Sequence, residues 1–371
     1  LTEKEISALE DPSEYLRFKH YYERDFVYEM MKLNQALTGY TTLDHVCGVH
    51  HLAVKIARQL KRAQVPIDLG RVSGAAAGHD VGKYGCRGDE LRRVAYYHYY
   101  YTGKWFEERG ITYIRNVAIN HSTWDLEVEN LSLESLVLIY CDFRVKSDDD
   151  DKMRFYTLQD SFQVILDKLD NVDEAKENRY RRVYSKLLDF EDYMHHLGIS
   201  TDPDVEIDLD LPYKRKRVHY SLIHGESLVT YAKFTSIEHN ILLMNRLRDE
   251  TTLNRMLESA RGLENANDLR GYIDILEDYN TYLTIKQKQI VINFLYSKLI
   301  SSEEDVRKQC AYLMGVLIAN LDEAIRKELP PSAVIASHEE ESVDMFRRYL
   351  HRMLDPEQKI IGKHRGWIAY S

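Results

Sequence analysis

The chain has 371 residues, with 50 Lys and Arg against 60 Asp and Glu and a formal net charge of −10 at neutral pH. This length is sufficient for two domains with cores of their own, and the negative charge argues against a general nucleic-acid binder while still allowing a local basic phosphate pocket. No apolar run reaches about 18 residues and no signal-peptide pattern opens the chain, so neither a membrane span nor secretion is predicted.

The first helix that carries a candidate site residue is predicted to begin at Thr41–Thr42, which are good capping residues. From His45 to Leu60, apolar residues recur at helical spacing on one face. His45 heads this face, so we expect it to point into the core. His50 and His51 point off the face and are interpreted as hydrogen-bonded or exposed residues, not ligands.

The second such helix is predicted to end at a His-Asp pair. One face runs from Leu69 to His79, and Val81–Gly82 ends the pattern. His79 and Asp80 would then lie where a helix ends and side chains can reach a cleft, a placement that indicates a metal site. Lys83, three residues after Asp80, is placed to steady a phosphate as a point charge, although a solvated residue after a helix end is the alternative.

Three more candidate ligands follow in the order His, His, Asp. His98 lies within Tyr-Tyr-His-Tyr-Tyr-Tyr, where packing among aromatic rings is the alternative interpretation. His121 closes an apolar face that begins at Ile114, and Asp142 shares a face with Leu138. A carboxylate pointing inward there would be costly to bury without a cation or a partner.

The order His, His-Asp, His, His, Asp is typical of a two-metal site. Imidazole and carboxylate ligands suit divalent iron or manganese, with zinc, cobalt or magnesium as alternatives. Two such ions about 3.5 to 4 Å apart activate a bridging hydroxide and neutralise charge on a phosphoryl group. The expected metal ligands are His45, His79, Asp80, His98, His121 and Asp142.

These motifs resemble the HD-domain phosphohydrolases over roughly residues 20 to 200. The resemblance rests on His45 with its apolar face, on His-Asp-Val-Gly-Lys, and on the Tyr-Cys-Asp turn at Asp142. The most similar pattern is the dinuclear branch that includes the symmetrical dinucleoside tetraphosphate hydrolases. By this likeness His98 and His121 are the two extra ligands, Asp80 bridges the metals, and the substrate is a nucleotide or a related phosphoester. Arg144 departs from the family's usual sequence after the last Asp.

Other HD branches match less well. The cyclic dinucleotide phosphodiesterases carry a doubled His and a Gly-Tyr-Pro element, whereas this chain has His-Ser-Thr-Trp-Asp from His121. Alarmone hydrolases usually follow His-Asp with an acidic pair, and here Val81–Lys83 follows instead. Some six-ligand HD proteins are di-iron oxygenases that cleave carbon bonds, so the ligand set alone leaves oxygenation open. A ligand-sensing module that controls partner binding is a further alternative.

The organisation of the chain changes near residue 200. A long helical pattern ends before Gly198, and residues 201–219, around Pro203 and Pro212, are the predicted linker. The short basic run Lys214–Arg217 within it is interpreted as a solvated turn. The acidic run Asp148–Asp151 is interpreted as a solvated loop.

Beyond the linker, residues 220–371 are predicted to form helices that recur in pairs. Apolar spacing indicates a helix over Ile285–Ile300, and Ser301–Glu304 caps a second one. The Glu-Asp-Val-Arg start of the latter is similar to HEAT repeats, whose helix pairs stack into a solenoid. A plain helical bundle is the alternative. A solenoid would offer a concave surface for a protein partner.

The four cysteines are dispersed, and no two of them form a Cys-x-x-Cys pair. This distribution indicates neither a disulfide framework nor a zinc knuckle, and a reduced, cytoplasmic setting is the simplest expectation. The sequence begins with Leu1, which suggests either a trimmed chain or a segment of a longer protein.

The complete prediction is an all-α protein. An HD-domain helical bundle over residues 1–200 holds two metal ions and hydrolyses a small phosphorylated substrate, with Lys83 and Arg144 neutralising phosphate charge. A HEAT-like α-solenoid over residues 220–371 recruits a protein partner or regulates the enzyme.

Overall fold

The computed structural model describes residues 1–122, 131–148, 150, 152–168, 173–209, 212–213, 219–221, 223–319 and 339–355. This part of the chain is mostly α-helical, so the all-α class is confirmed, and it contains one two-stranded hairpin. None of its helices combines the length and the apolar character needed to cross a membrane. The predicted basic run Lys214–Arg217 lies outside the described residues.

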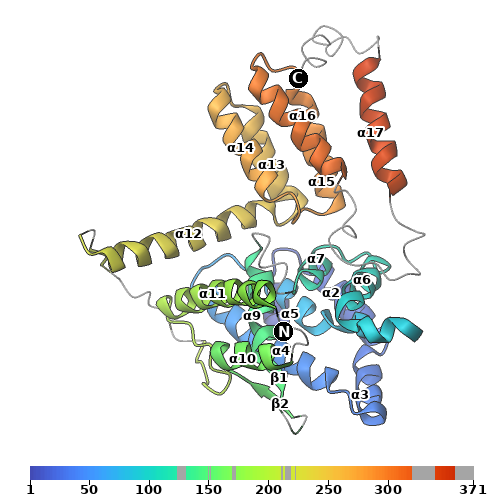
Figure 1. The fold of residues 1–371 in the computed structure, drawn as a ribbon, viewed down its shortest axis with the longest axis vertical. Coiled ribbons are helices and arrows are strands. Elements are labelled where there is room, and N and C mark those ends of the chain that lie inside the picture. Colours follow the sequence, from blue (N-terminus) through green and yellow to red (C-terminus); the bar gives the residue numbers. More distant parts are fainter. Residues whose placement is uncertain are drawn as a thin grey trace. The chain divides into compact units, whose positions relative to one another are not determined.

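The chain divides into two compact units, Leu1–Asn245 and Arg246–Ser371 (Figure 1). The division falls within helix α12. The domain boundaries expected from the sequence, 1–200, 201–219 and 220–371, stay a prediction. The elements that begin in the first unit are α1 (Glu3–Ser7), α2 (Pro12–Arg24), α3 (Val27–Thr38), α4 (Thr42–Arg62), α5 (Leu69–Gly78), η1 (Val81–Tyr84), η2 (Gly88–Arg93), α6 (Val94–Glu107), α7 (Tyr113–Ile119), α9 (Leu133–Arg144), β1 (Val145–Ser147), β2 (Met153–Phe155), α10 (Leu158–Lys168), α11 (Glu174–His196) and α12 (Gly225–Leu247). Those of the second unit are α13 (Glu250–Arg261), α14 (Ala266–Asp278), α15 (Ile285–Lys298), α16 (Glu304–Ala319) and α17 (Glu339–Leu354).

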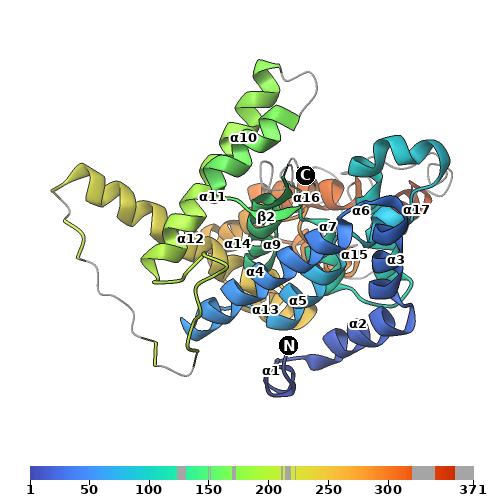
Figure 2. The ribbon, with the colours of Figure 1, turned by 90° about the horizontal axis from the view of Figure 1, so that it is seen from below.

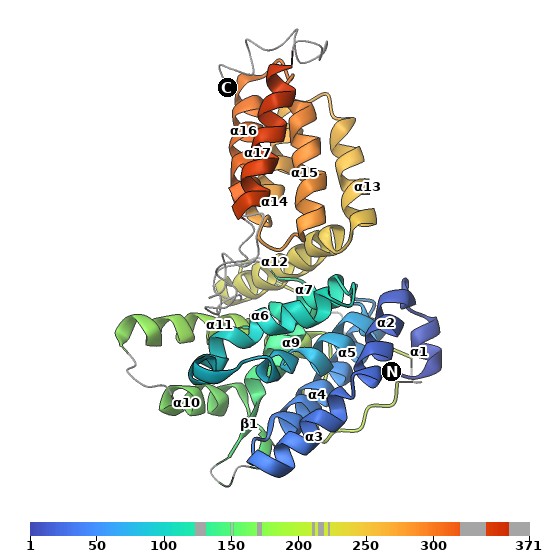
Figure 3. The ribbon, with the colours of Figure 1, turned by 90° about the vertical axis from the view of Figure 1, so that its right-hand side faces the viewer.

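Helix α4 is the central element of the first unit, and it packs against α3, α5, α9 and the β-hairpin (Figure 3). Its predicted apolar face is confirmed, because the side chains along it are fully buried. Thr41 is the N-cap residue, although its side chain makes no capping hydrogen bond. Burial of each large side chain on this face stabilises the unit by about 1.5 to 3 kcal/mol. The buried residues of this face include Val49, Leu52, Ala53, Ile56, Ala57 and Leu60.

Small residues let the neighbours of α5 approach its backbone closely. A Cβ atom on Gly74 would lie 2.9 Å from Cδ1 of Ile114, and one on Gly78 would lie 2.8 Å from Cζ of Phe106. The helix begins at an Asp68 cap, whose side chain accepts a hydrogen bond from a first-turn amide. This close packing brings the end of α5, where the His-Asp pair follows, deep into the first unit.

The strands β1 and β2 form an antiparallel hairpin directly after α9, with Val145 paired to Phe155. Asp148 orders the turn between them, since its carboxylate accepts hydrogen bonds from the amide of Lys152 at 2.9 Å and from Nε of Arg154 at 2.5 Å. This acid of the predicted solvated loop therefore has a local structural role. The hairpin fixes the backbone that follows Asp142.

The segment after α11 is held against α4 by hydrogen bonds to its backbone. Gln59 and Ser200 exchange two of them, at 2.9 and 2.8 Å. The ammonium of Lys55 donates to the carbonyl oxygens of Asp202 and Pro203, both at 2.8 Å. The first residues of the predicted linker are therefore anchored on the first unit.

In the second unit, the helix pair predicted from residue 285 onward is confirmed as α15 and α16, which pack against each other. Thr284 caps α15 and forms a capping box with Gln287. The apolar positions that defined the pair, among them Val291, Leu295 and Leu313, are fully buried. Helix α14 packs on α13 and on α16, and α17 packs on α16.

Candidate metal centre

Four imidazoles and two carboxylates come together in the first unit. Each comes from a separate segment, apart from the adjacent His79 and Asp80 that follow α5. Two groups of side chains among them have the composition and spacing needed to hold a metal ion. All six ligands expected from the sequence are thus brought into contact: His45 from α4, His79 and Asp80 after α5, His98 from α6, His121 after α7, and Asp142 from α9.

The first group surrounds one oxygen of Asp80. Oδ2 of Asp80 lies 3.7 Å from Nε2 of His45 and 3.6 Å from Nε2 of His79. These two nitrogens are 3.4 Å apart. Asp142 completes the group, with Oδ1 2.9 Å from Nε2 of His45 and 3.8 Å from Nε2 of His79.

The second group surrounds the other oxygen of the same carboxylate. Oδ1 of Asp80 lies 3.7 Å from Nε2 of His98, and Nε2 of His98 lies 3.3 Å from Nε2 of His121. The ligand atoms of Asp80, His98 and His121 all lie within 4.8 Å of one another. Asp80 therefore presents one oxygen to each pair of imidazoles, as a carboxylate that bridges two ions would.

In every one of the four imidazoles, Nδ1 contacts a backbone carbonyl oxygen. A carbonyl oxygen only accepts, so Nδ1 carries a proton and donates it. A neutral imidazole in this state keeps a lone pair on Nε2, which is the tautomer in which histidine binds metal through Nε2. The four contacts are His45 to Val145 at 3.0 Å, His79 to Ala76 at 2.9 Å, His98 to Val94 at 2.8 Å, and His121 to Ala118 at 2.5 Å.

With these tautomers, the lone pair on Nε2 of His45 faces that of His79, and the lone pair on Nε2 of His98 faces that of His121. No hydrogen bond can join two neutral Nε2 atoms that both lack a proton, so each pair needs a positive charge between its members. The same need applies between His45 and Asp142, where the contact is 2.9 Å. Ligand atoms about 2.1 Å from one ion lie about 3.0 to 3.4 Å from each other, which is the separation found within both pairs.

Burial keeps three of the four imidazoles neutral. It lowers the pKa of His98 to about 4, lowers that of His79, and lowers that of His121 well below its usual value. Burial would also raise the pKa of Asp80, but the Lys83 ammonium and the imidazoles outweigh it, and the pKa lies well below the usual range. Burial would also raise the pKa of Asp142, but the adjoining His45 imidazole outweighs it and holds this pKa below its usual range. Near pH 7, His79, His98 and His121 are therefore neutral imidazoles, and Asp80 and Asp142 are carboxylates.

Lys83, the predicted phosphate-binding cation, contacts the shared carboxylate itself. Its ammonium lies 2.5 Å from Oδ2 of Asp80, and one third of its side chain is exposed. The attraction of Asp80 exceeds the effect of burial and raises the pKa of Lys83, so the lysine is charged. It is the cation that balances Asp80 when no metal ion does.

The η1 turn that carries Lys83 is locked against α6. Gly82 donates its amide to Oγ1 of Thr102 at 3.0 Å, and this hydroxyl donates to the carbonyl of His79 at 2.9 Å. A Cβ atom on Gly82 would lie 2.0 Å from the carbonyl oxygen of His98. Only glycine leaves room for this approach, which sets the positions of Asp80 and His98 relative to each other.

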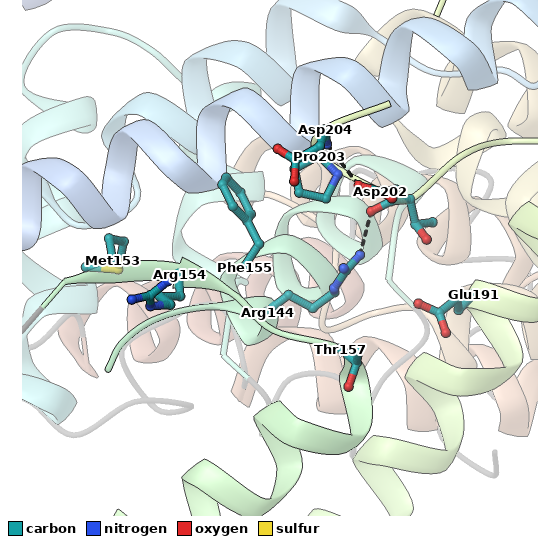
Figure 4. A pocket seen from close by; sticks show the side chains of 10 residues that line it. Arg144, Met153, Arg154, Phe155, Thr157, Glu191, Asp202, Pro203 and Asp204 are labelled. Atoms are coloured by element: carbon teal, nitrogen blue, oxygen red, sulfur yellow. Dashed lines mark hydrogen bonds between the residues drawn. The ribbon is translucent and has the colours of Figure 1, made fainter. Parts of the chain in front are cut away.

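Arg144 is not brought into the cluster. It follows Asp142 by two residues on α9, which turns the two side chains toward different sides of the helix. Its guanidinium donates to the carbonyl oxygens of Tyr156 and Thr201, both at 2.7 Å, and to the hydroxyl of Tyr140 at 2.8 Å. Figure 4 shows it beside a cavity of about 560 Å³ lined also by Glu191. These contacts give the predicted phosphate role of Arg144 no support.

Two residues near the cluster were missed in the sequence. The ring of Tyr99 lies against both imidazoles of the second pair, with centroid distances of 3.9 Å to His98 and 4.7 Å to His121. Lys146 adds a positive charge that helps to lower the pKa of Asp142. Lys146 lies in β1, after the end of α9, so helical spacing gave no signal for it.

Comparison of the chain with protein-family models, with curated proteins and with solved structures finds no match.

Proposed function

We propose that this chain is a metal-dependent phosphohydrolase of the HD type that acts on a nucleotide or a related phosphoester. One observation carries the proposal: the carboxylate of Asp80 lies between two pairs of imidazoles and turns one oxygen toward each. Two divalent ions sharing a carboxylate are the usual arrangement for in-line displacement at phosphorus.

The side chains fit two divalent ions. His45, His79 and Asp142 would hold one, and His98 and His121 would hold the other, with Asp80 bridging them. Iron or manganese suits this mixture of nitrogen and oxygen donors, and zinc, cobalt or magnesium can also bind to it. When bound, the ions would supply an activated water and neutralise charge on the phosphoryl group.

Lys83 supports a phosphoester over an uncharged substrate. Its ammonium is partly exposed and rests on a carboxylate that metal ions would also bind. With Asp80 bound to metal, the ammonium of Lys83 would be free to contact a second anion. A phosphoryl group whose negative charge grows in the transition state is stabilised by such a cation.

For the second unit, we propose a HEAT-like arrangement that binds a protein partner. The packing of α13 with α14 and of α15 with α16, together with the contacts of α14 and α17 with α16, supports it. The alternative for the whole protein, a ligand-sensing HD module that acts through these helices, predicts metal and ligand binding without turnover.

The test is a screen of the full chain, loaded with Mn²⁺, for phosphate or nucleotide release from nucleotides, dinucleoside polyphosphates and cyclic dinucleotides. We expect turnover of at least one phosphoester and its loss in Asp80→Asn. His51→Gln, which alters an exposed imidazole on the same helix as His45, serves as the matched control and should retain turnover. Equal turnover by Asp80→Asn would contradict the proposal, and metal binding without any turnover would favour the sensing module.

A further inference from the structure

Helix α3 and the residues at its two ends expose a row of large apolar side chains. Figures 1 and 2 both draw α3 at the edge of the first unit. Met30, Leu33 and Leu37 follow one another at spacings of three and four residues, which places them on one face, and Phe26 and Tyr40 flank them. We call these five residues the α3 stripe. Their exposed fractions are Phe26 66%, Met30 37%, Leu33 61%, Leu37 76% and Tyr40 71%.

The helix does not need this face for its own packing. A different face of α3 carries Val27 and Met31, which are 1% and 0% exposed and form a small core with Leu43 and Val81. An ordinary surface helix has one apolar face, and the remainder is polar. A second apolar face with a three-and-four spacing is typical of a helix that pairs with another helix.

Phe26 adds an independent observation. It is the N-cap residue of α3 and has a φ of 52° and a ψ of 40°, in the left-handed region. This conformation costs a non-glycine residue about 1 to 2 kcal/mol, and here it accompanies a ring that is 66% exposed. In an isolated chain, both the backbone conformation of Phe26 and the exposure of its ring are unfavourable. Burial of the ring by a partner would offset the free-energy cost of both.

We infer that the α3 stripe binds the α3 stripe of a second copy of this chain, as an antiparallel helix pair around a twofold axis. An isologous contact needs a surface that is complementary to itself, and five uncharged side chains in one row satisfy that need. With the helices antiparallel, Phe26 of one copy meets Leu37 of the other, and Met30 meets Leu33.

The size of the stripe is consistent with such a dimer. Two aromatic and three aliphatic side chains exposed to this extent present roughly 500 to 600 Å², which is as large as the biggest apolar patch on a typical monomer. Two copies would bury roughly 1,000 to 1,200 Å² through these side chains alone, near the lower limit for specific association. Met30 also lines a cavity of about 620 Å³ with Tyr84 and Trp105, which leaves room for a side chain of the second copy. A weak, micromolar dimer follows.

The test is sedimentation equilibrium of the full chain from about 1 to about 100 µM. We expect a reversible monomer–dimer equilibrium, and we expect Leu33→Glu to weaken it at least tenfold, since each copy would bury a charge. Leu91→Glu is the matched control, because Leu91 is 59% exposed and lies outside the stripe. It should leave the equilibrium unchanged, and all three proteins should keep the same metal content.

Two results would overturn the inference. A dimer that Leu33→Glu leaves intact would place the interface elsewhere. A chain that stays monomeric over the whole concentration range would assign the stripe to another occupant. In that case a lower Tm of Leu33→Glu would point to another part of the same chain, and an unchanged Tm would point to a different protein.

Discussion

The ammonium of Lys83 lies 2.5 Å from Oδ2 of Asp80, the carboxylate that both imidazole pairs share. Both residues belong to one short segment in which η1 follows α5, so the contact is fixed locally. Lys83 and a metal ion therefore compete for the same oxygen. The lysine stabilises the metal-free centre, and under the proposed function it would become available to a substrate phosphate once Asp80 binds metal.

We predict close to two transition-metal ions per chain in protein purified without chelator, because the ligands form two groups, one around each oxygen of Asp80. Asp80→Ala should empty the centre, since both ions lose their shared ligand. His98→Ala should leave about one ion, held by the His45 group. Elemental analysis checks all three proteins. If the wild type holds at most one ion per chain and His98→Ala does not change this content, the centre is mononuclear. His98 is then a residue of the aromatic cluster and not a ligand.

Lys83→Gln is expected to separate metal binding from turnover. Removing the ammonium leaves Asp80 without its competing cation, so metal affinity should rise. Loss of the same charge next to the phosphoryl group should lower kcat by about 100-fold or more. Titration with Mn²⁺ and steady-state kinetics measure the two effects. Lys104→Gln, at an exposed lysine of α6, is the control. If metal affinity and kcat fall together in Lys83→Gln, the residue only supports the local fold.

Gly82→Ala should disrupt the centre although the substitution adds a single methyl group. Its Cβ would lie 2.0 Å from a backbone oxygen of His98 and 2.3 Å from the amide nitrogen of Thr102, so η1 must move away from α6. Both metal content and Tm should fall. Gly271→Ala is the matched control, because nothing lies within 4 Å of its Cβ position in α14. That change should stabilise the protein by about 0.5 to 1 kcal/mol. A normal metal content in Gly82→Ala would contradict the proposed role of this close approach.

Stability should fall below pH 6.5 through His50. Burial, with smaller effects from the amino terminus, Arg58 and His51, lowers the pKa of His50 from 6.5 to about 4 in the folded chain. The unfolded chain therefore binds more protons between pH 4 and 6.5, so the free energy of unfolding decreases as the pH falls through this window. The loss attributable to His50 is about 3 kcal/mol at most.

His50→Gln isolates this contribution, because glutamine can keep a hydrogen bond to Ser73, which His50 makes at 2.9 Å, without titrating. The difference in unfolding free energy between wild type and variant, from urea denaturation at several pH values, should change between pH 6.5 and 4 and stay flat above pH 7. A difference that does not depend on pH would mean that His50 titrates normally in the folded chain.

The source of oxygen in the product should distinguish hydrolysis from oxygenation, which use the same ligands. We expect protein loaded with Mn²⁺ to release phosphate or a nucleotide under anaerobic conditions and to incorporate one oxygen atom from labelled water. Mass spectrometry of the product gives the answer. Turnover that requires dioxygen and iron, with label entering from the gas, would replace the hydrolase proposal with the oxygenase alternative.

Much of the site could be predicted from the sequence because helical periodicity is a local property. The spacing of apolar residues located α4, α5 and α9, and it placed His45 and Asp142 on their inward faces. The small residues of α5 and the adjacent His79 and Asp80 marked the end of that helix as the place for a metal. Residue type and order therefore sufficed to name all six side chains.

Only the tertiary structure decided how these side chains share the centre. Packing of helices far apart in the sequence gives one oxygen of Asp80 to each imidazole pair, and backbone carbonyls fix every tautomer. The same packing turned Arg144 toward backbone carbonyls and left the α3 stripe exposed. Distances between segments depend on how all the side chains of a core pack together. The residue pattern of a single helix therefore does not determine them.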